Sequence, residues 1–379
     1  MVNNMTYSEI RHQFAEQLSW TDTRLLAWAT EIIGVPKETP ANSFVLHAPL
    51  ELMARAALLP RLSSGDRDHA RARIVWLVVS YLEAGASVSL PGSLSPPSIS
   101  GAVSSLLKAI ETSDLDEVDR YAAWLGENAS ADDLKRLLGT SFACSLAGAA
   151  HGSIALHLMG RTPAIGGSVL RGIAREIGRH PEWKVQSDGL ATGDRPLLDA
   201  LLEIPELGMP GSSSIFPMVA HGADAAIDLL GNVSSDPIAG ARALSRVAAW
   251  SMLQDSAEHV PYGWTHTLSI PQAVMSLDLD PAVAVAVAGT QIVGFRASMG
   301  TRPLDPWRSP QEAAPSPEVD LVSSALRHFD AHLVKYTLAC FDAAAADPEQ
   351  AHLYAAAASH LSSWWATQPD DRFFEGGDQ

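Results

Sequence analysis

The chain has 379 residues, of which 47% are hydrophobic and 18% charged, and its formal net charge is −17. This composition is typical of a folded globular protein with a large core. The negative charge argues against nucleic acids and anionic membrane surfaces as partners, because both would be repelled. The two cysteines, Cys144 and Cys340, lie in apolar, Ala-rich stretches, so neither a disulfide framework nor a Cys-based zinc site is expected.

The first residues, MVNNMTYSEI, lack the basic and apolar regions of a signal peptide. No apolar run reaches the length needed to span a bilayer. We therefore expect a soluble, cytoplasmic protein that makes no membrane contact.

The first part of the chain is predicted to form successive helices. The apolar periodicity predicts helices over 7–18, 21–33, 70–84, 102–110, 114–125 and 131–138, although the β-branched run in 70–84 would also suit a strand. A further helix is expected to begin at Pro49, which places His47 just before it. Residues 85–100 (GASVSLPGSLSPPSIS) are predicted to be a loop within the domain.

The middle of the chain contains an apolar segment rich in small residues, SFACSLAGAAHGSIALHLMGR (141–161), which predicts a buried helix carrying His151 and His157. A histidine in such surroundings costs free energy unless it is hydrogen-bonded or bound to a metal. The more polar residues 161–196 are expected to cross the surface. Predicted helices then follow over 197–204, 215–230 (with His221) and 239–252.

In the last part of the chain, WTHTLSIPQAVMSL (264–277) places His266 near a helix kink or start, just before Pro271. A buried helix is predicted over 282–295. The five prolines of 301–317 predict a rigid loop, after which a helix begins near Glu318. A last helix over 348–365 and a mobile tail over 367–379 complete the chain.

The sequence contains no glycine fingerprint for dinucleotides, no phosphate loop and no G-x-S-x-G elbow in a suitable context. We predict an all-α fold, with residues 1–379 forming a single large domain whose helices pack around a central His-rich pocket.

The stretch HFDAHLVK (328–335) is a candidate metal-binding segment. On a continuous helix, His328, His332 and Lys335 lie at i, i+4 and i+7 and project from one face. Two imidazoles one turn apart can bind one divalent ion, and desolvation favours the neutral form of a lysine. The alternative is a solvent-exposed face of a surface helix, which short motifs often turn out to be.

Several segments resemble the questin oxidase-like family, found among the tailoring enzymes of aromatic polyketides. Three segments are similar to motifs of this family: GAAHGSIALHLMGR, WTHTLSIPQAV and DAHLVKYTLACF. A fourth, FVLHAPLELMARAAL, is similar more loosely, because a second histidine beside His47 is missing. The likeness runs from about residue 40 to 366, with long unmatched stretches. It implies an all-α non-haem iron oxygenase whose ligands are the following residues: His47, His151, His266, His332 and a carboxylated Lys335. His157, His221 and His328 are alternative ligands.

A neutral lysine amine that takes up CO2 becomes a carbamate, which is an anionic oxygen ligand. Four imidazoles and one such oxygen suit Fe(II), Mn(II) or Zn(II), and an octahedral site keeps one open position for O2 or substrate. We assign Lys335, His332 and His266 the catalytic roles. Apolar and aromatic side chains would suit a flat aromatic substrate, although each of the candidates also fits plain core packing: Met218, Trp264, Phe295, Phe329 and Tyr336.

The sequence thus predicts an iron-dependent oxygenase that acts with O2 on an anthraquinone-like polyketide. A homodimer is compatible with this prediction. Either oxidative ring cleavage or a Baeyer–Villiger-type oxygen insertion with NADPH as co-substrate fits this expectation. Two alternatives are a non-catalytic helical scaffold or binding protein, and a metal-dependent hydrolase or cyclase that uses no redox chemistry.

Overall fold

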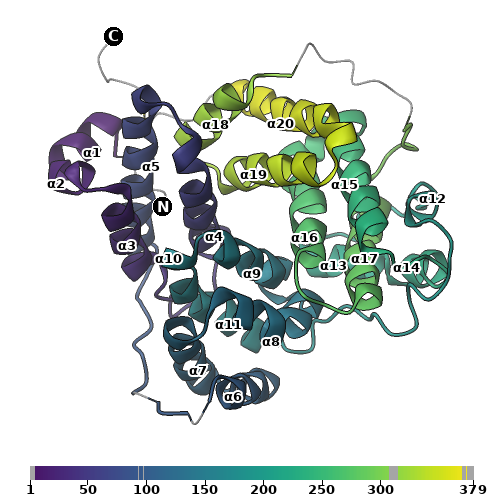
Figure 1. Ribbon diagram of the computed structural model, residues 1–379, viewed down its shortest axis with the longest axis horizontal. Helices are drawn as coiled ribbons and strands as arrows, with labels where there is room; N and C mark the ends of the chain where they lie inside the picture. Colours follow the sequence, from purple (N-terminus) through teal and green to yellow (C-terminus); the bar gives the residue numbers. More distant parts are fainter. Residues whose placement is uncertain (1–4, 93, 97, 307–314, 369–372, 374–379) are drawn as a thin grey trace.

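The computed structural model describes residues 5–92, 94–96, 98–306, 315–368 and 373, and throughout this part of the chain the regular structure is helical. Extended pairing within the described residues is limited to isolated bridges, one of which joins Lys37 to Ser87. The predicted all-α fold is confirmed (Figure 1).

The main helices have these bounds: α1 Tyr7–Gln13, α2 Ala15–Ser19, α3 Asp22–Ile33, α4 Ser43–Leu58, α5 Ser64–Glu83, α6 Ile99–Glu111, α7 Leu115–Asn128, α8 Ala131–Cys144, α9 His151–Arg161, α10 Pro163–Gly166, α11 Leu170–Arg179, α12 Leu197–Leu201, α13 Ile215–His221, α14 Ala223–Leu230, α15 Pro237–Gln254, α16 Thr265–Met275, α17 Pro281–Met299, α18 Glu318–Arg327, α19 Ala331–Ala346 and α20 Ala351–Ala366. A π-helical turn, η5 (Val260–Trp264), leads into α16.

Four helices meet in the middle of the molecule although they are far apart in sequence. Helix α4 packs against α9 and α19, and α16 packs against the same two helices. Figure 1 shows α6, α7 and α11 below this group, α1 to α3 and α5 on one side, and α15 and α17 on the other. One contiguous apolar cluster runs through these layers.

Helix α17 forms part of the interior. By length and composition it is the one described helix that could cross a membrane, but every residue from Ala284 to Met299 is buried against neighbouring helices. A helix that is apolar on all sides and buried in this way is typical of the core of a large protein. The arrangement is compatible with a soluble protein.

Residues 161–196 do not simply cross the surface, as the sequence had predicted. They form α10 and α11, and α11 buries Ile173 and Ile177. Its two buried arginines, Arg171 and Arg175, pair with the fully buried carboxylate of Asp119 on α7. The charged residues of α11 suggested a surface segment, but inside the protein they pair with a buried carboxylate.

The described residues of the predicted loop 85–100 lie between α5 and α6 as far as Ser98, and α6 begins at Ile99, so it includes the last two residues of the predicted loop. Within the predicted loop 301–317, residues 307–314 lie outside the described part. The predicted tail also falls mostly outside it, but Phe373 is described and is buried, with its ring 3.9 Å from the Arg73 guanidinium carbon.

Candidate metal centre

His47 lies inside α4 and not ahead of it, so the predicted helix start at Pro49 is wrong. The Asn42 side chain accepts a hydrogen bond from the backbone N–H of Val45, and this N-cap starts the helix at Ser43. The Nδ1 atom of His47 lies 2.5 Å from the carbonyl oxygen of Ser43, one turn earlier. Because a carbonyl can only accept, Nδ1 carries the proton, and Nε2 keeps its lone pair for another partner.

His151 is the first residue of α9, and the predicted continuous helix over 141–161 is interrupted just before it. Helix α8 ends at Cys144, and Gly148, Ala149 and Ala150 then adopt left-handed conformations, with φ between 53° and 56°. Alanine is strained in this region, where glycine is not. The turn redirects the chain so that His151 is fully buried at the centre.

His266 is the second residue of α16, near a helix start as predicted. Its Nδ1 donates to the carbonyl oxygen of Tyr262 in the π-helical turn η5. This is the same i−4 arrangement that orients His47, and it again leaves Nε2 unprotonated. Pro271 lies inside α16 and does not end it.

His332 and Lys335 are one turn apart on α19, but His328 is not on the same helix. Helix α18 ends at Arg327, and α19 begins at Ala331 after Asp330, whose carboxylate accepts from the backbone N–H of His332. The same carboxylate lies 3.1 Å from His332 Nδ1. An N-cap therefore replaces the predicted continuous helix and also orients one of the candidate ligands.

The four imidazoles converge. The ligand atoms of His47, His151 and His266 all lie within 4.8 Å of one another. The Nε2 atoms of His151 and His266 are 3.2 Å apart. The ring of His332 is 4.4 Å from that of His47 and 4.9 Å from that of His266, centroid to centroid. The structure thus brings together four imidazoles from residues that are separated by up to 285 positions in the sequence.

Burial dominates the electrostatics of this cluster. It lowers the pKa of His47, His151 and His266 well below 6.5, and the neighbouring basic groups lower them further. These histidines are therefore neutral at pH 7, the form in which imidazole binds metals.

Lys335 is buried beside the cluster, and desolvation lowers its pKa from 10.5 to about 7. The carboxylates of Asp330 and Glu51 oppose this shift without cancelling it. About half of the lysine is therefore neutral near pH 7, which makes its amine nucleophilic.

Buried polar atoms test whether a cation fits here. Within the described residues, His47 Nε2, His151 Nδ1 and Lys335 Nζ have no hydrogen-bond partner. Buried polar atoms without a partner are rare and costly unless a ligand satisfies them. His47 Nε2 is both unpartnered and aimed into the cluster, and the donor set, all nitrogen with one modifiable amine, suits a divalent transition metal.

A buried ion pair connects the ligand-bearing elements. Arg55, fully buried on α4, donates to the Glu51 carboxylate one turn earlier. Its remaining N–H groups donate to the carbonyl oxygens of Leu326 and His328, at 2.7 and 2.6 Å. The guanidinium thereby fixes the break between α18 and α19 against α4, and with it the start of the helix that carries His332 and Lys335.

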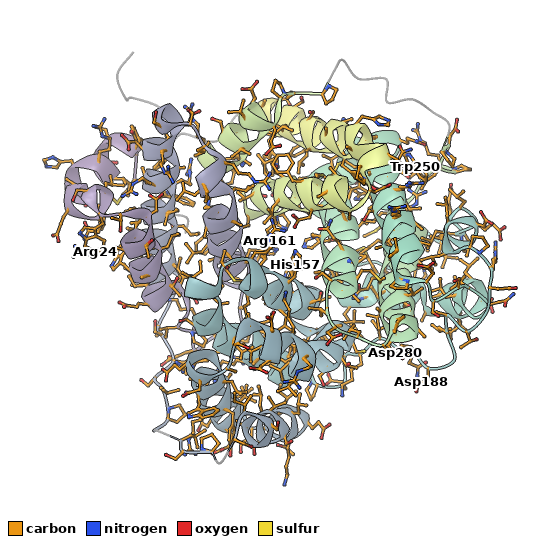
Figure 2. The ribbon with its side chains drawn as sticks, viewed as in Figure 1. Arg24, His157, Arg161, Asp188, Trp250 and Asp280 are labelled. Atoms are coloured by element: carbon orange, nitrogen blue, oxygen red, sulfur yellow. The ribbon has the colours of Figure 1, made fainter. Side chains whose placement is uncertain are left out.

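The three alternative ligands lie elsewhere. His157 points from α9 toward α19, where its Nε2 is 3.4 Å from the Asp342 carboxylate and its Nδ1 is 2.6 Å from the Ser276 hydroxyl (Figure 2). His221 is exposed at the end of α13. His328 Nδ1 accepts from the backbone N–H of Asp330, and its ring packs against Trp365.

The supporting groups were not identified from the sequence. Asp330 could have been found, because an Asp two residues before a histidine at a helix start is a recognisable N-cap. The carbonyl acceptors of Ser43 and Tyr262 and the ties from Arg55 leave no such signal, since backbone acceptors have no residue preference.

Most of the side chains that were expected to line a substrate site are buried in the core. Trp264 and Phe295 are fully buried, and Trp264 packs against Arg296. Tyr336 is also fully buried in the core, and Met218 is buried on α13. Phe329 is half-buried, and its ring lies against those of His328 and Trp365.

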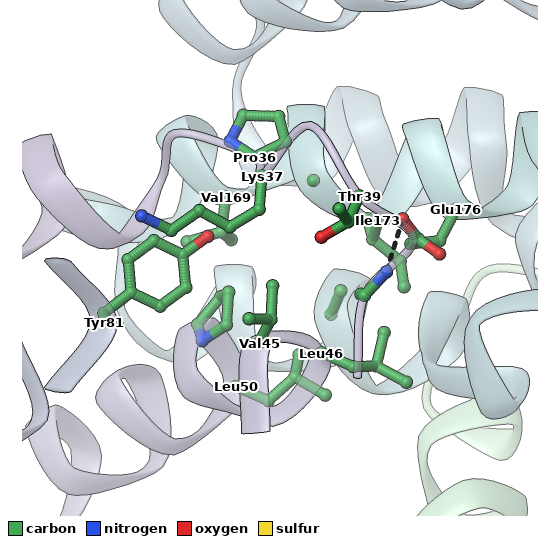
Figure 3. A pocket seen from close by; sticks show the side chains of 14 residues that line it. Pro36, Lys37, Thr39, Val45, Leu46, Leu50, Tyr81, Val169, Ile173 and Glu176 are labelled. Carbon is green, nitrogen blue, oxygen red and sulfur yellow. Dashed lines mark hydrogen bonds between the residues drawn. The ribbon is translucent and has the colours of Figure 1, made fainter. Parts of the chain in front are cut away.

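A separate apolar cavity of about 30 Å³ lies on another face of α4 (Figure 3). Val45, Leu46 and Leu50 form one wall, and Lys37 and Glu176 lie near its edge. The Glu176 carboxylate accepts from the backbone N–H of Ala41 at 3.3 Å, the dashed line in Figure 3. Such a volume holds one or two water-sized molecules and is too small for a polycyclic substrate.

Comparisons with protein-family models, with curated proteins and with solved structures found no match.

Proposed function

We propose that this protein is a metal-dependent oxygenase that holds one iron(II) ion and acts with O2 on a planar aromatic, anthraquinone-like polyketide. The observation that carries the proposal is the convergence of three buried, neutral imidazoles within 4.8 Å, with His332 and Lys335 beside them. The proposed ligands are those implied by the family resemblance: His47, His151, His266, His332 and Lys335.

Lys335 would serve as a carbamate. The lone pair of the neutral Nζ forms a bond to the carbon of CO2, and one proton leaves the nitrogen for solvent. The product is an anionic oxygen ligand that partly balances the charge of a divalent ion. This assignment explains why an amine with no partner is buried next to four imidazoles.

A bound iron ion would supply the redox chemistry with O2. The protein's contribution is to hold the ligands and to keep bulk water out. The Nδ1 atoms of three imidazoles are held in place: His47 by Ser43, His266 by Tyr262 and His332 by Asp330. Each of these imidazoles is less than a tenth exposed. Manganese or zinc would fit the same donors, so the metal must be identified by analysis.

Two reactions are consistent with this proposal: oxidative ring cleavage, and a Baeyer–Villiger-type insertion that consumes NADPH. Product analysis with and without NADPH separates them. We further propose that the protein works in the cytoplasm, in line with the burial of α17, the one described helix long and apolar enough to cross a membrane.

The test is elemental analysis of wild-type protein and of Lys335→Ala, both purified anaerobically without chelator. We expect near-stoichiometric iron in the wild type and its loss in the variant, with O2 consumed only by the iron-loaded wild type when an aromatic substrate is present. A metal that supports turnover without O2 consumption would point to a hydrolase or cyclase. Absence of metal from both proteins would favour a non-catalytic binding protein.

A further inference from the structure

A further cavity, of about 230 Å³, lies where α13 and α14 pack against α17. None of the five proposed metal ligands lines it. Eight of its twelve lining residues are aliphatic, so its interior suits an apolar group. Leu146, Val219 and Ala226 are buried members of this lining.

Thr290 brings the buried helix α17 into the lining. Its side chain is 5% exposed, and its hydroxyl donates to the carbonyl oxygen of Ala286, one turn earlier on the same helix, at 2.8 Å. The one proton of this hydroxyl is therefore already used. A bound molecule needs no acceptor on this side of the cavity, and an alkyl group fits there.

Glycines on α17 keep the space around Thr290 open. A Cβ atom at Gly294 would lie 2.6 Å from the Cα atom of Val219, so α17 already touches α13 there. A Cβ atom at Gly289 would lie 2.9 Å from the Leu230 side chain, so α17 also touches α14. Because the helices are in contact on both sides of Thr290, they cannot move closer to fill the space between them.

Another wall of the cavity comes from the segment that follows α11. The backbone N–H of Val185 donates to the carbonyl oxygen of Cys144, and that of Leu146 donates to the carbonyl oxygen of Trp183, both at 2.8 Å. The Trp183 ring stacks on the ring of Phe216, which also lines the cavity, at 4.6 Å and an interplanar angle of 8°. These contacts fix the wall before a ligand arrives, so binding pays little for ordering it.

Lys184 is the one ionisable residue in the lining. Its side chain is exposed. Asp188 lies on the same segment, but in the part of the chain that the structure describes neither it nor another carboxylate pairs with the Lys184 ammonium. An apolar interior with one unpaired cation at its rim is complementary to a molecule with an apolar body and one anionic end.

We propose that this cavity binds an aliphatic monocarboxylate, with the chain between α13, α14 and α17 and the carboxylate at the Lys184 ammonium. An apolar cavity of about 150 Å³ takes up benzene, so one of about 230 Å³ fits a chain of roughly eight or nine carbons. The aliphatic lining favours a chain over a flat ring. The site lies outside the candidate metal centre, and its ligand is additional to the proposed substrate.

The test is calorimetry on the whole chain with three probes: octanoate, butyrate and 1-octanol. We expect octanoate to bind roughly a hundredfold more tightly than butyrate, because butyrate buries four methylene groups fewer. Octanoate should also bind about threefold to fivefold more tightly than 1-octanol, the size of one exposed ion pair. Equal affinities for octanoate and butyrate, or no octanoate binding, would overturn the site.

Ala223→Leu tests the location, because Ala223 is half-buried in the lining and a leucine there takes up part of the cavity. We expect octanoate to bind about tenfold more weakly to this variant. Ala225→Leu makes the same change at a half-buried position of α14 outside the lining, so it is the matched control and should keep the wild-type affinity. Undiminished octanoate binding in Ala223→Leu would place the ligand elsewhere and overturn the inference.

Lys184→Met tests the anionic end of the ligand. It should remove the preference for octanoate over 1-octanol and leave the affinity for 1-octanol unchanged. Lys108→Met removes the same charge from an exposed position of α6, so it controls for the net charge and should keep the preference. A preference that survives in Lys184→Met refutes the carboxylate assignment. The measurement needs no metal, so its outcome is separate from that of the proposed oxygenase.

Discussion

The buried amine of Lys335 lowers the stability of the metal-free folded protein. Its pKa falls from 10.5 to about 7 on burial. Below pH 7 the amine is charged in both the folded and the unfolded state, and the folded state bears the full cost of burying that charge, roughly 5 kcal/mol. Between pH 7 and 10.5 the unfolded state binds more protons, so stability rises with pH and the cost disappears.

We therefore expect Lys335→Met to stabilise the metal-free protein by a few kcal/mol at pH 6 and to remove most of the rise in stability between pH 7 and 10. The measurement is denaturant unfolding of chelator-treated protein at several pH values. A variant less stable than the wild type at pH 6 would contradict the burial of a lysine without a partner.

His328 and His151 show what residue-level patterns miss. Helical spacing placed His328 on one face with His332, but Asp330 competes as an N-cap and breaks the helix between them. The helix expected through His151 contains three glycines, and two of them, Gly152 and Gly160, are helical in the structure. Nothing local requires Ala149 and Ala150 to be left-handed. Tertiary packing imposes that conformation, so the sequence does not show it.

Among elements, two arginines of different burial join α4 and the residues after it to α18. Arg55 is fully buried, pairs with Glu51 on its own helix and donates to the carbonyl oxygens of Leu326, in the last turn of α18, and of His328, just after it. Arg61, just after α4, pairs with Glu318 at the start of α18, but the two side chains are 37% and 60% exposed. Buried pairs are costly to break and exposed ones contribute little.

Arg55→Met should lower the free energy of unfolding by about 3–5 kcal/mol, because Glu51 and two carbonyls lose their partner. It should also weaken metal binding, since the start of α19 is no longer fixed. Arg61→Ala is the control and should change stability by less than about 1 kcal/mol. Thermal unfolding and metal titration of both variants measure this, and equal effects would refute the ranking by burial.

Most helices could be predicted because their periodicity and caps are local. Thr21 and Ser130 start α3 and α8 where the sequence indicated. Helix α11 could not be recognised in the same way, because its buried arginines pair with Asp119 on another helix. An element whose polar residues are satisfied by distant partners looks like a surface segment when read alone.

At the scale of the whole molecule, the candidate centre lies where four helices meet, and these helices are also joined by packing and by polar contacts such as those of Asp342 with His157 and Arg161. Which histidines converge depends on how α4, α9, α16 and α19 pack, and composition and periodicity do not specify that packing. The family resemblance supplied the set of five residues, and their geometry could only come from the fold.

A ligand that binds only the folded state stabilises it by mass action, by about 2.7 kcal/mol at one hundred times its dissociation constant. We expect iron(II) to raise the unfolding temperature of the wild type and chelation to reverse the rise. His151→Ala should lose this shift. His221→Ala, which removes an exposed histidine outside the cluster, should retain it. A shift that survives in His151→Ala would place the metal elsewhere.

The spacing of the converging side chains also bears on synthesis. His47 emerges early from the ribosome, but Lys335 follows only after most of the chain has been made. No nascent fragment that stops before α19 contains the full proposed set, so the proposed centre could assemble only near the end of translation.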